Sequence, residues 1–233
     1  ELHQWVGQFF FATTGAAMAL SGLYFAMTAA ALAYRRSRLA CQPIPADADL
    51  PSVTVHIPTY NELAALNCAQ LCLDFDYPGD KLQIMIGDDS SDAAISMRID
   101  EFARRNPGVK VSRRGGNMGF KPGNLNHMLR DTRGEYILIL DSDFLPGRDF
   151  LRRLAAPAAL DPSLAGVQAS WRVANARQTF STLMGTGIIN VIHVVILPLL
   201  KRWAGTVLFC GSAELVRKDL LVRHGGWTPG AMT

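Results

Sequence analysis

The chain has 233 residues, a formal net charge of +3 and four cysteines. This length suits one α/β domain with one accessory segment. The weak charge, with no basic cluster interleaved with stacking aromatics, argues against a nucleic-acid partner. The cysteines show neither a paired framework nor a zinc-binding spacing, so we interpret them as reduced thiols packed as small apolar side chains.

The first segment has the features of a membrane anchor. Residues 9–34 contain no charged side chain, and the basic run RRSR follows directly. About 20 apolar residues cross a bilayer, and flanking cations stay on the cytoplasmic side. We therefore predict a transmembrane anchor with a basic stop at residues 1–38, then a polar linker at 39–51. A cleaved signal peptide is the alternative, but the apolar run is too long and its basic residues lie on the wrong side.

Predicted strands and helices alternate after the linker. Strands are expected at residues 53–58, 83–89, 109–114, 135–140 and 165–171. Helices are expected at residues 61–74 and 92–105, from about 122, and from about 148, with Ser91 or Asp92 as the cap of the second. This order predicts an α/β fold with a mostly parallel sheet and helices on both faces.

Residues 183–200 are ambiguous because they form an uncharged apolar run that reaches the transmembrane threshold. The run contains Asn190, His193 and Pro198, and globular sequence resumes after it. A span here would also place the following segment on the opposite side of the membrane. We therefore expect either a buried helix or one that skims the membrane surface.

Polar residues follow the first, second and fourth predicted strands, in the segments "IPTYNE", "GDDSSD" and "LDSDF". Carboxyl ends of parallel strands meet at one edge of a sheet, so these segments are expected to form one crevice. Asp141 and Asp143 can both turn toward one ion if the strand breaks at Ser142, and oxygen ligands suit Mg²⁺ or Mn²⁺. Between the second and fourth strands, "RRGGNMGFKPGN" offers cations and glycine backbone to a phosphate.

The segments "IPTYNE", "DDSSD", "KPGNLNH", "DSD" and "FCGSAELVRKDLL…GGW" occur in this order. In this the chain resembles, over about Pro51 to Thr233, the processive, membrane-bound family 2 glycosyltransferases, the group of cellulose, hyaluronan and poly-N-acetylglucosamine synthases. The resemblance implies a glycosyltransferase-A fold over residues 52–233. It also implies a nucleotide-sugar donor, usually UDP-linked, a glycan or lipid acceptor, a Mg²⁺ or Mn²⁺ ion and inversion at the anomeric carbon.

The resemblance also implies roles for single residues. The residues implied to bind the donor nucleotide are Thr59, Tyr60 and Glu62 beside the base and ribose, Asp89 at the uracil N–H, Lys121 near the diphosphate and Asp141 near the sugar and ribose. Proline in "KPGN" replaces the alanine that is common in the family. The implied metal ligands are Asp141 and, more directly, Asp143, and the implied acceptor-side residues are Cys210, Gly211 and Ser212.

The catalytic base is expected outside this chain. In the family it is an aspartate in a Thr-Glu-Asp motif shortly after the "GGW" loop, and here the sequence stops at Thr233. The chain begins with Glu1, so we expect a piece truncated at both ends that does not turn over by itself. The sequence thus predicts a membrane-anchored inverting glycosyltransferase at the inner or plasma membrane, with its catalytic domain in the cytoplasm. A non-catalytic membrane subunit with a retained nucleotide-sugar domain and a nucleotidyl or phosphosugar transferase remain alternatives.

Overall fold

The computed structural model describes residues 2–38 and 43–228. The chain divides into two compact units, one formed by residues 1–41 and 170–208, the other by residues 42–169 and 209–233. The predicted catalytic domain at residues 52–233 therefore contributes to both units. The predicted linker at 39–51 lies partly outside the described residues, because residues 39–42 are not described.

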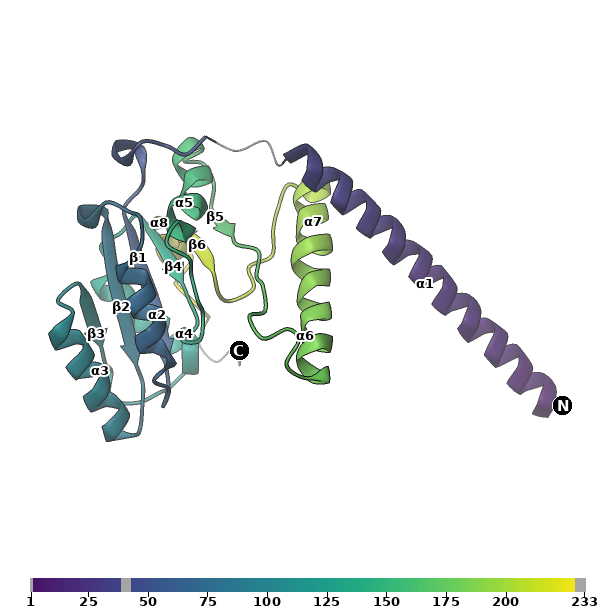
Figure 1. Cartoon of the computed structure of the whole chain (residues 1–233), viewed down its shortest axis with the longest axis horizontal. Coiled ribbons are helices and arrows are strands. Elements are labelled where there is room, and N and C mark those ends of the chain that lie inside the picture. The colour runs from purple at the N-terminus through teal and green to yellow at the C-terminus, as the bar shows by residue number, and fades with distance from the viewer. Residues whose placement is uncertain (1, 39–42, 229–233) are drawn as a thin grey trace. The chain divides into compact units, whose positions relative to one another are not determined.

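The second unit contains one six-stranded sheet with the order β3-β2-β1-β4-β6-β5 (Figure 1). Its strands are β1 (Val53–Thr59), β2 (Leu82–Asp88), β3 (Val109–Ser112), β4 (Tyr136–Ile139), β5 (Gly166–Gln168) and β6 (Glu214–Arg217). The pairs β3-β2, β2-β1 and β1-β4 are parallel, whereas β6 runs antiparallel to both β4 and β5. The mostly parallel α/β sheet is thus confirmed.

The last two strands differ from the sequence prediction. The fifth predicted strand is shorter than expected, with β5 limited to Gly166–Gln168, and the sequence did not indicate β6. β6 is inserted between β4 and β5, so residues more than forty positions apart form neighbouring strands. A mixed sheet with antiparallel strands at one side is common in large α/β folds.

Helices flank the sheet and bury its apolar side chains. They are α2 (Ala64–Leu73), α3 (Ala93–Arg105), α4 (Phe120–Met128), α5 (Phe150–Leu160) and α8 (Lys218–Arg223), with short 3₁₀ turns at Asp47–Asp49, Gly79–Lys81 and Leu129–Asp131. On one face, Met85 of β2 and Ile137 of β4 pack with Leu125 and Met128 of α4. Asp92 caps α3 by accepting a hydrogen bond from the Ala94 N–H (2.8 Å). Of the two predicted caps, Ser91 and Asp92, the structure thus confirms Asp92.

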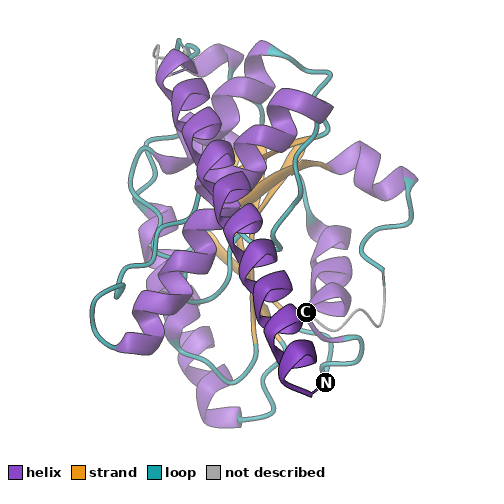
Figure 2. Cartoon of the chain, turned by 90° about the vertical axis from the view of Figure 1, so that its right-hand side faces the viewer, coloured by secondary structure: helices purple, strands orange, loops and turns teal. Residues whose placement is uncertain are grey.

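The first unit consists of long apolar helices. α1 (Leu2–Arg38) is one unbroken helix, as Figure 2 shows. The second helical run joins α6 (Phe180–Asn190), the π-helical η4 (Val191–Ile196) and α7 (Leu197–Ala204). The widened η4 turns precede Pro198, a residue that cannot donate a backbone hydrogen bond to the preceding turn.

Both helical runs are long and apolar enough to cross a membrane. They are His3–Ala33, with a mean hydropathy of 1.6, and Phe180–Ala204, with a mean hydropathy of 2.1. Only 22% of the apolar window in the second run is buried, so the prediction of a buried helix at residues 183–200 is wrong. The alternative that this helix skims the membrane stays a prediction.

Close packing of the backbone at Gly134 gives a test of the sheet. An added methyl there would lie 2.5 Å from the backbone nitrogen of Thr54 and 2.7 Å from the carbonyl carbon of Val53. Because backbone atoms cannot move aside, Gly134→Ala is expected to lower the free energy of unfolding by about 1–3 kcal/mol. The measurement is the urea midpoint of the detergent-solubilised chain. Gly79→Ala, with nothing within 4 Å of the added methyl, is the control, and equal midpoints for the two variants would contradict this packing.

Candidate active site

The ends of three parallel strands meet at one edge of the sheet, as the sequence predicted. Thr59 at the end of β1 is in register with Asp88 at the end of β2. The Asp89 N–H donates to the Thr59 carbonyl (3.1 Å), and the Leu140 N–H donates to the His56 carbonyl (3.0 Å). Backbone pairing therefore brings the segments after β1, β2 and β4 together.

A cavity of about 410 Å³ lies at this edge. Its lining includes five of the predicted donor residues: Thr59, Tyr60, Glu62, Asp89 and Lys121. Asn117, Phe120, Asn124 and Ser142 also line it. The volume falls in the range of about 300–1,000 Å³ that small-molecule sites commonly have.

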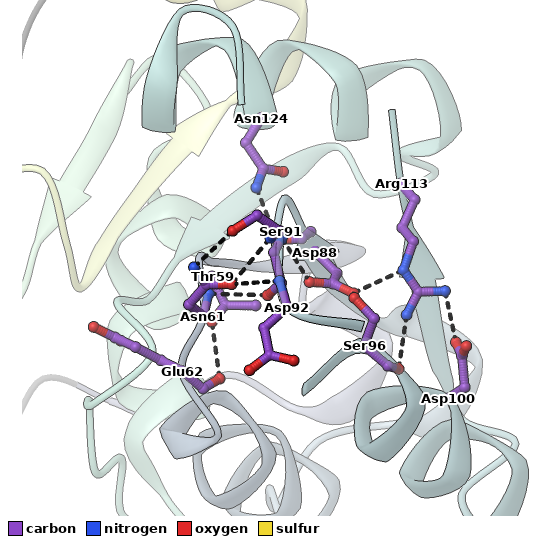
Figure 3. Close-up of polar contacts among 12 residues, drawn as sticks. Thr59, Asn61, Glu62, Asp88, Ser91, Asp92, Ser96, Asp100, Arg113 and Asn124 are labelled. Carbon is purple, nitrogen blue, oxygen red and sulfur yellow. Dashed lines mark hydrogen bonds and ion pairs between the residues drawn. The ribbon is translucent and has the colours of Figure 1, made fainter. Parts of the chain in front are cut away.

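Asn61 hydrogen-bonds the loop after β1 to the loop after β2 (Figure 3). The Asn61 side-chain oxygen accepts hydrogen bonds from the Ser91 and Asp92 N–H groups (3.0 Å each), and its own N–H donates to the Ser90 hydroxyl (2.9 Å). Asn61 has a φ of 56°, a left-handed conformation that asparagine tolerates better than most residues. The sequence offered the motif but gave this residue no role.

The residues predicted to lie beside the base and ribose, Thr59, Tyr60 and Glu62, belong to the end of β1 and the loop after it. The Thr59 hydroxyl donates to the Glu62 carbonyl (3.1 Å), and the Tyr60 hydroxyl lies 3.3 Å from the Ser91 hydroxyl. The Ser142 hydroxyl donates to the Glu62 carboxylate, which joins the β1 loop to the segment after β4. These contacts fix the wall of the cavity.

Asp88, the last residue of β2 and the first of the two adjacent aspartates, has a structural role. Its fully buried carboxylate accepts hydrogen bonds from Arg113 Nε (2.7 Å) and the Ser96 hydroxyl (2.7 Å), and Arg113 extends to Asp100 (2.8 Å), as Figure 3 shows. Burial by itself would raise the pKa of Asp88, but hydrogen bonds from Ser90, Ser96 and Arg113 outweigh it and lower the pKa below its ordinary value. Asp88 therefore stays ionised and ties α3 and the segment after β3 to the sheet.

Asp89, the second aspartate, lines the cavity and is oriented by Arg114. The Arg114 guanidinium donates to both Asp89 carboxylate oxygens (2.9 Å from Nε and 2.6 Å from Nη2). It also donates to the Met118 and Phe120 carbonyls (2.5 and 3.2 Å). Arg114 thus fixes the direction of the Asp89 carboxylate and the path of the glycine-containing loop. The sequence predicts that Arg113 and Arg114, the two arginines of "RRGGNMGFKPGN", lie near a phosphate. In the structure, Arg113 pairs with Asp88 and Arg114 pairs with Asp89.

Lys121 joins the predicted donor side to the predicted acceptor side. Its ammonium donates to Asp141 Oδ1 (2.5 Å) and to the Gly211 carbonyl (2.6 Å). The Asp141 N–H in turn donates to the Ser212 hydroxyl (2.8 Å). Lys121, Asp141, Gly211 and Ser212 come from segments far apart in sequence, and the structure brings them together.

Two residues that the sequence reasoning missed support the Cys210–Ser212 loop. The Gln168 side-chain oxygen accepts from the Cys210 N–H (2.9 Å), and the Glu214 carboxylate accepts from the Gly211 N–H (3.0 Å). Burial raises the pKa of Glu214, although the Gly211 N–H and the Lys121 charge act in the opposite direction. Burial and the nearby Glu214 charge likewise raise the pKa of the Cys210 thiol, which favours a neutral wall residue over a nucleophile. The sequence did carry a signal for both residues, because Gln168 and Glu214 are each a polar residue inside a short apolar segment.

The two predicted metal ligands are accessible to a ligand. The Asp141 side chain is 41% exposed and Asp143 is exposed, just beyond the end of β4. Within residues 2–38 and 43–228, no group of three or more His, Cys, Asp or Glu side chains forms a closed metal centre. Two carboxylates fit a Mg²⁺ or Mn²⁺ ion that takes its other ligands from water and phosphate oxygens. The expected position of the catalytic base lies outside the described residues, which end at Thr228.

Comparison with known proteins identifies the family. The family model described as "Glycosyl transferase family 2" matches residues 54–221, so the chain belongs to glycosyl transferase family 2. It is 33% identical over 199 residues to cellulose synthase 2 of Novacetimonas hansenii, covering 82% of this chain and 12% of that protein. It is 34% identical over 188 residues to the UDP-forming cellulose synthase catalytic subunit of Pseudomonas fluorescens, covering 76% of this chain and 24% of that protein.

A plant relative is named for another polysaccharide. The chain is 31% identical over 191 residues to the probable glucomannan 4-beta-mannosyltransferase 15 of Arabidopsis thaliana, covering 76% of this chain and 34% of that protein. The chain therefore spans only about an eighth to a third of the length of these relatives. The resemblance found in the sequence is confirmed at the level of the family.

Solved structures support the fold. The mannosyltransferase PcManGT from Pyrobaculum calidifontis, in complex with GDP-Man and Mn²⁺, matches with a TM-score of 0.63 and 25% identity over 91% of this chain and 58% of that chain. S. aureus TarS in complex with UDP-GlcNAc matches with a TM-score of 0.54 and 22% identity over 76% of this chain and 48% of that chain, which shows the fold alone. The predicted glycosyltransferase-A type of fold is confirmed.

The buried Asp88 gives the protein a specific pH dependence. Asp88→Asn removes the charge that Arg113 neutralises, and it is expected to lower the free energy of unfolding at pH 7 by about 1–3 kcal/mol. Because folding lowers the pKa of Asp88, its stabilising contribution is present above the ordinary carboxyl pKa and is lost as the pH falls through the lowered value. The difference between the wild-type and variant proteins should therefore shrink on acidification below about pH 4.

Urea titrations at a series of pH values measure this difference. Asp80→Asn, at an exposed aspartate, is the control and should change the free energy of unfolding by less than about 0.5 kcal/mol at any pH. A difference for Asp88→Asn that stays constant down to pH 3 would contradict the assigned ion pair.

Proposed function

We propose that this chain forms the donor-binding part of a membrane-anchored, inverting glycosyltransferase that uses a nucleotide sugar, UDP-linked, and a glycan or lipid acceptor. One observation carries the proposal: Lys121 contacts both Asp141 and the Gly211 carbonyl, beside a cavity that Asp89 lines. Such a cluster can hold the diphosphate of a donor between its base and its transferred sugar. The names of the relatives, a UDP-forming synthase and a mannosyltransferase among them, support the same class of reaction.

In the proposed complex, the nucleotide lies in the cavity, where hydrogen bonds and the shape of the wall orient it. Asp89 presents a carboxylate oriented by Arg114, and a carboxylate accepts well from the N–H of a uracil ring. Thr59, Tyr60 and Glu62 form the wall beside the base and ribose. Arg114 thus acts as a positioning residue for the base.

The diphosphate is placed at the cationic end of the site. Lys121 can exchange its contact with Asp141 for a phosphate oxygen as the leaving group gains negative charge. A divalent ion held by Asp143 and Asp141 would supply further charge neutralisation to the leaving diphosphate. The exposed Asp143 carboxylate and the Mn²⁺ in the solved mannosyltransferase complex support this assignment.

The acceptor is placed against the Cys210–Ser212 loop. Gln168, Glu214 and Lys121 fix the backbone of this loop, so its position is set relative to Asp141. Inversion also requires a base to take the proton of the acceptor hydroxyl, and that base remains predicted to follow Thr233. The apolar α1 and the basic run after it support anchoring with the catalytic domain on the cytoplasmic side.

Replacement of Asp143 tests the proposal. In the full-length protein, Asp143→Asn is expected to weaken Mn²⁺-dependent UDP binding by roughly 10–100-fold, the range seen when groups that support a bound metal are removed. Isothermal titration with UDP, with Mn²⁺ and with EDTA, measures it. Asp149→Asn, which removes an exposed charge paired only with Arg153 among the described residues, is the control and should bind UDP normally.

The products of the reaction distinguish the alternatives. A glycosyltransferase releases UDP from a UDP-sugar, whereas a nucleotidyl transferase releases pyrophosphate. Wild-type metal dependence in Asp143→Asn would overturn the metal site, and pyrophosphate release would overturn the reaction class. A full-length protein that binds UDP-sugar but releases neither product would be a non-catalytic subunit.

A further inference from the structure

Phe120, the first residue of α4, has a backbone conformation that its side chain disfavours. Its φ is 49°, and the φ of the preceding Gly119 is 72°. This left-handed region is ordinary for glycine, but it is an outlier for a bulky side chain and strains the chain there. The sequence reasoning gave Phe120 no role, although the residue lies inside "RRGGNMGFKPGN".

Hydrogen bonds to both backbone groups of Phe120 hold this conformation. The Phe120 N–H donates to the Asn117 carbonyl (2.8 Å), and the Phe120 carbonyl accepts from Arg114 Nη2 (3.2 Å). The same Arg114 nitrogen donates to the Asp89 carboxylate (2.6 Å). A strained residue persists where its surroundings fix it in this way. One guanidinium therefore fixes the backbone of Phe120 and the carboxylate of Asp89 relative to each other.

Burial does not explain a phenylalanine at this position. Phe120 is 52% exposed, so its ring gains only part of the stabilisation that a core side chain gains from leaving water. For folding alone, glycine would adopt the same backbone conformation without strain. Strained residues of this kind are concentrated at active sites and at segments that clamp ligands. The exposed ring therefore indicates a role in binding rather than in the packing of the sheet.

The Phe120 side chain lies at the cavity that the proposed function gives to the nucleotide. Of the residues that line this cavity, Tyr60 and Phe120 are aromatic, and they come from the loop after β1 and from the start of α4. Asp89 lines the same cavity and can accept a hydrogen bond from the edge of a base. Such a bond orients the base within its own plane, whereas an aromatic ring binds the face of the base.

We propose that Phe120 is a donor-binding residue whose aromatic ring stacks on the face of the nucleotide base, while Asp89 binds the edge of that base. The inference rests on the proposed function and deepens it, because it names the side chain that supplies affinity for the base. Every base has a π-face, so the stack adds affinity, and the hydrogen bond to Asp89 selects the base. The fixed backbone of Phe120 reduces the ordering that binding requires.

Two ligands, one with a base and one without, test the stack in the full-length protein. Phe120→Gly is expected to weaken UDP binding in the presence of Mn²⁺ by roughly 5–150-fold, which corresponds to the loss of one stack between a base and an aromatic ring. Inorganic pyrophosphate has no base and should bind the variant as it binds the wild-type protein. Phe120→Tyr keeps a ring and should bind UDP within about twofold of wild type. Isothermal titration measures all three, and Met97→Ala, at an exposed side chain outside the cavity, is the control.

Tryptophan at the same position gives a direct signal of stacking. A base that stacks on an indole quenches its fluorescence, and the unsubstituted protein gives the background from the native tryptophans. Saturating UDP with Mn²⁺ should therefore quench Phe120→Trp more strongly than the unsubstituted protein, and inorganic pyrophosphate should not. Equal quenching of the two proteins by UDP would overturn the stack.

The titrations separate failure of this inference from failure of the proposed function. If the wild-type protein binds UDP and Phe120→Gly binds it equally well, the stack is overturned and the proposed function stands. If Phe120→Gly loses UDP and pyrophosphate by the same factor, the side chain acts through the fold or through the neighbouring Lys121, and the stack is again overturned. If the wild-type protein itself does not bind UDP, the proposed function is overturned together with the stack.

Discussion

Backbone pairing of β1 with its two parallel neighbours decides where the candidate site lies. β1 pairs in parallel with β2 on one side and with β4 on the other. The segments after these three strands therefore emerge at one edge of the sheet. Main-chain hydrogen bonds from Asp89 to Thr59 and from Leu140 to His56 set this convergence. The polar loops then need only short contacts, such as those of Asn61, to form a shaped cavity.

Charge balance within the crevice follows from this convergence. Carboxylates gathered at one edge repel each other unless each has a cation, and three of them do: Asp88 with Arg113, Asp89 with Arg114, and Asp141 with Lys121. The first pair contains the most buried carboxylate and serves the fold, whereas the third contains the most accessible carboxylate, and its lysine also holds the Gly211 carbonyl. In the part of the chain that the structure describes, Asp143 has no such cation. The carboxylates of this edge thus range from the buried, paired Asp88 to the exposed Asp143, which has no cationic partner among the described residues.

The sequence predicted the local elements and the convergence of motifs better than it predicted the long-range contacts. β1, β2 and β4 are short buried apolar runs, and α3 carries a recognisable cap, so their patterns are local. β6 was missed because Glu214–Arg217 begins and ends with charged residues, and only pairing on both sides with β4 and β5 makes it a strand. The partners of Asp88 and Asp89 were missed for the same reason, since Arg113 and Arg114 resemble a phosphate site until the register of β3 is known.

The insertion of β6 between β4 and β5 also has a consequence for synthesis. When β4 and β5 have left the ribosome, neither can complete its edge, because the strand that joins them comes after residues 170–208. The nascent chain therefore carries an unpaired apolar edge at Tyr136–Ile139 while a strongly apolar helix is being made. Open edges of this kind are prone to pair with other chains, and non-local strands form slowly. The sheet therefore closes only when Glu214–Arg217 emerges and pairs with both neighbours.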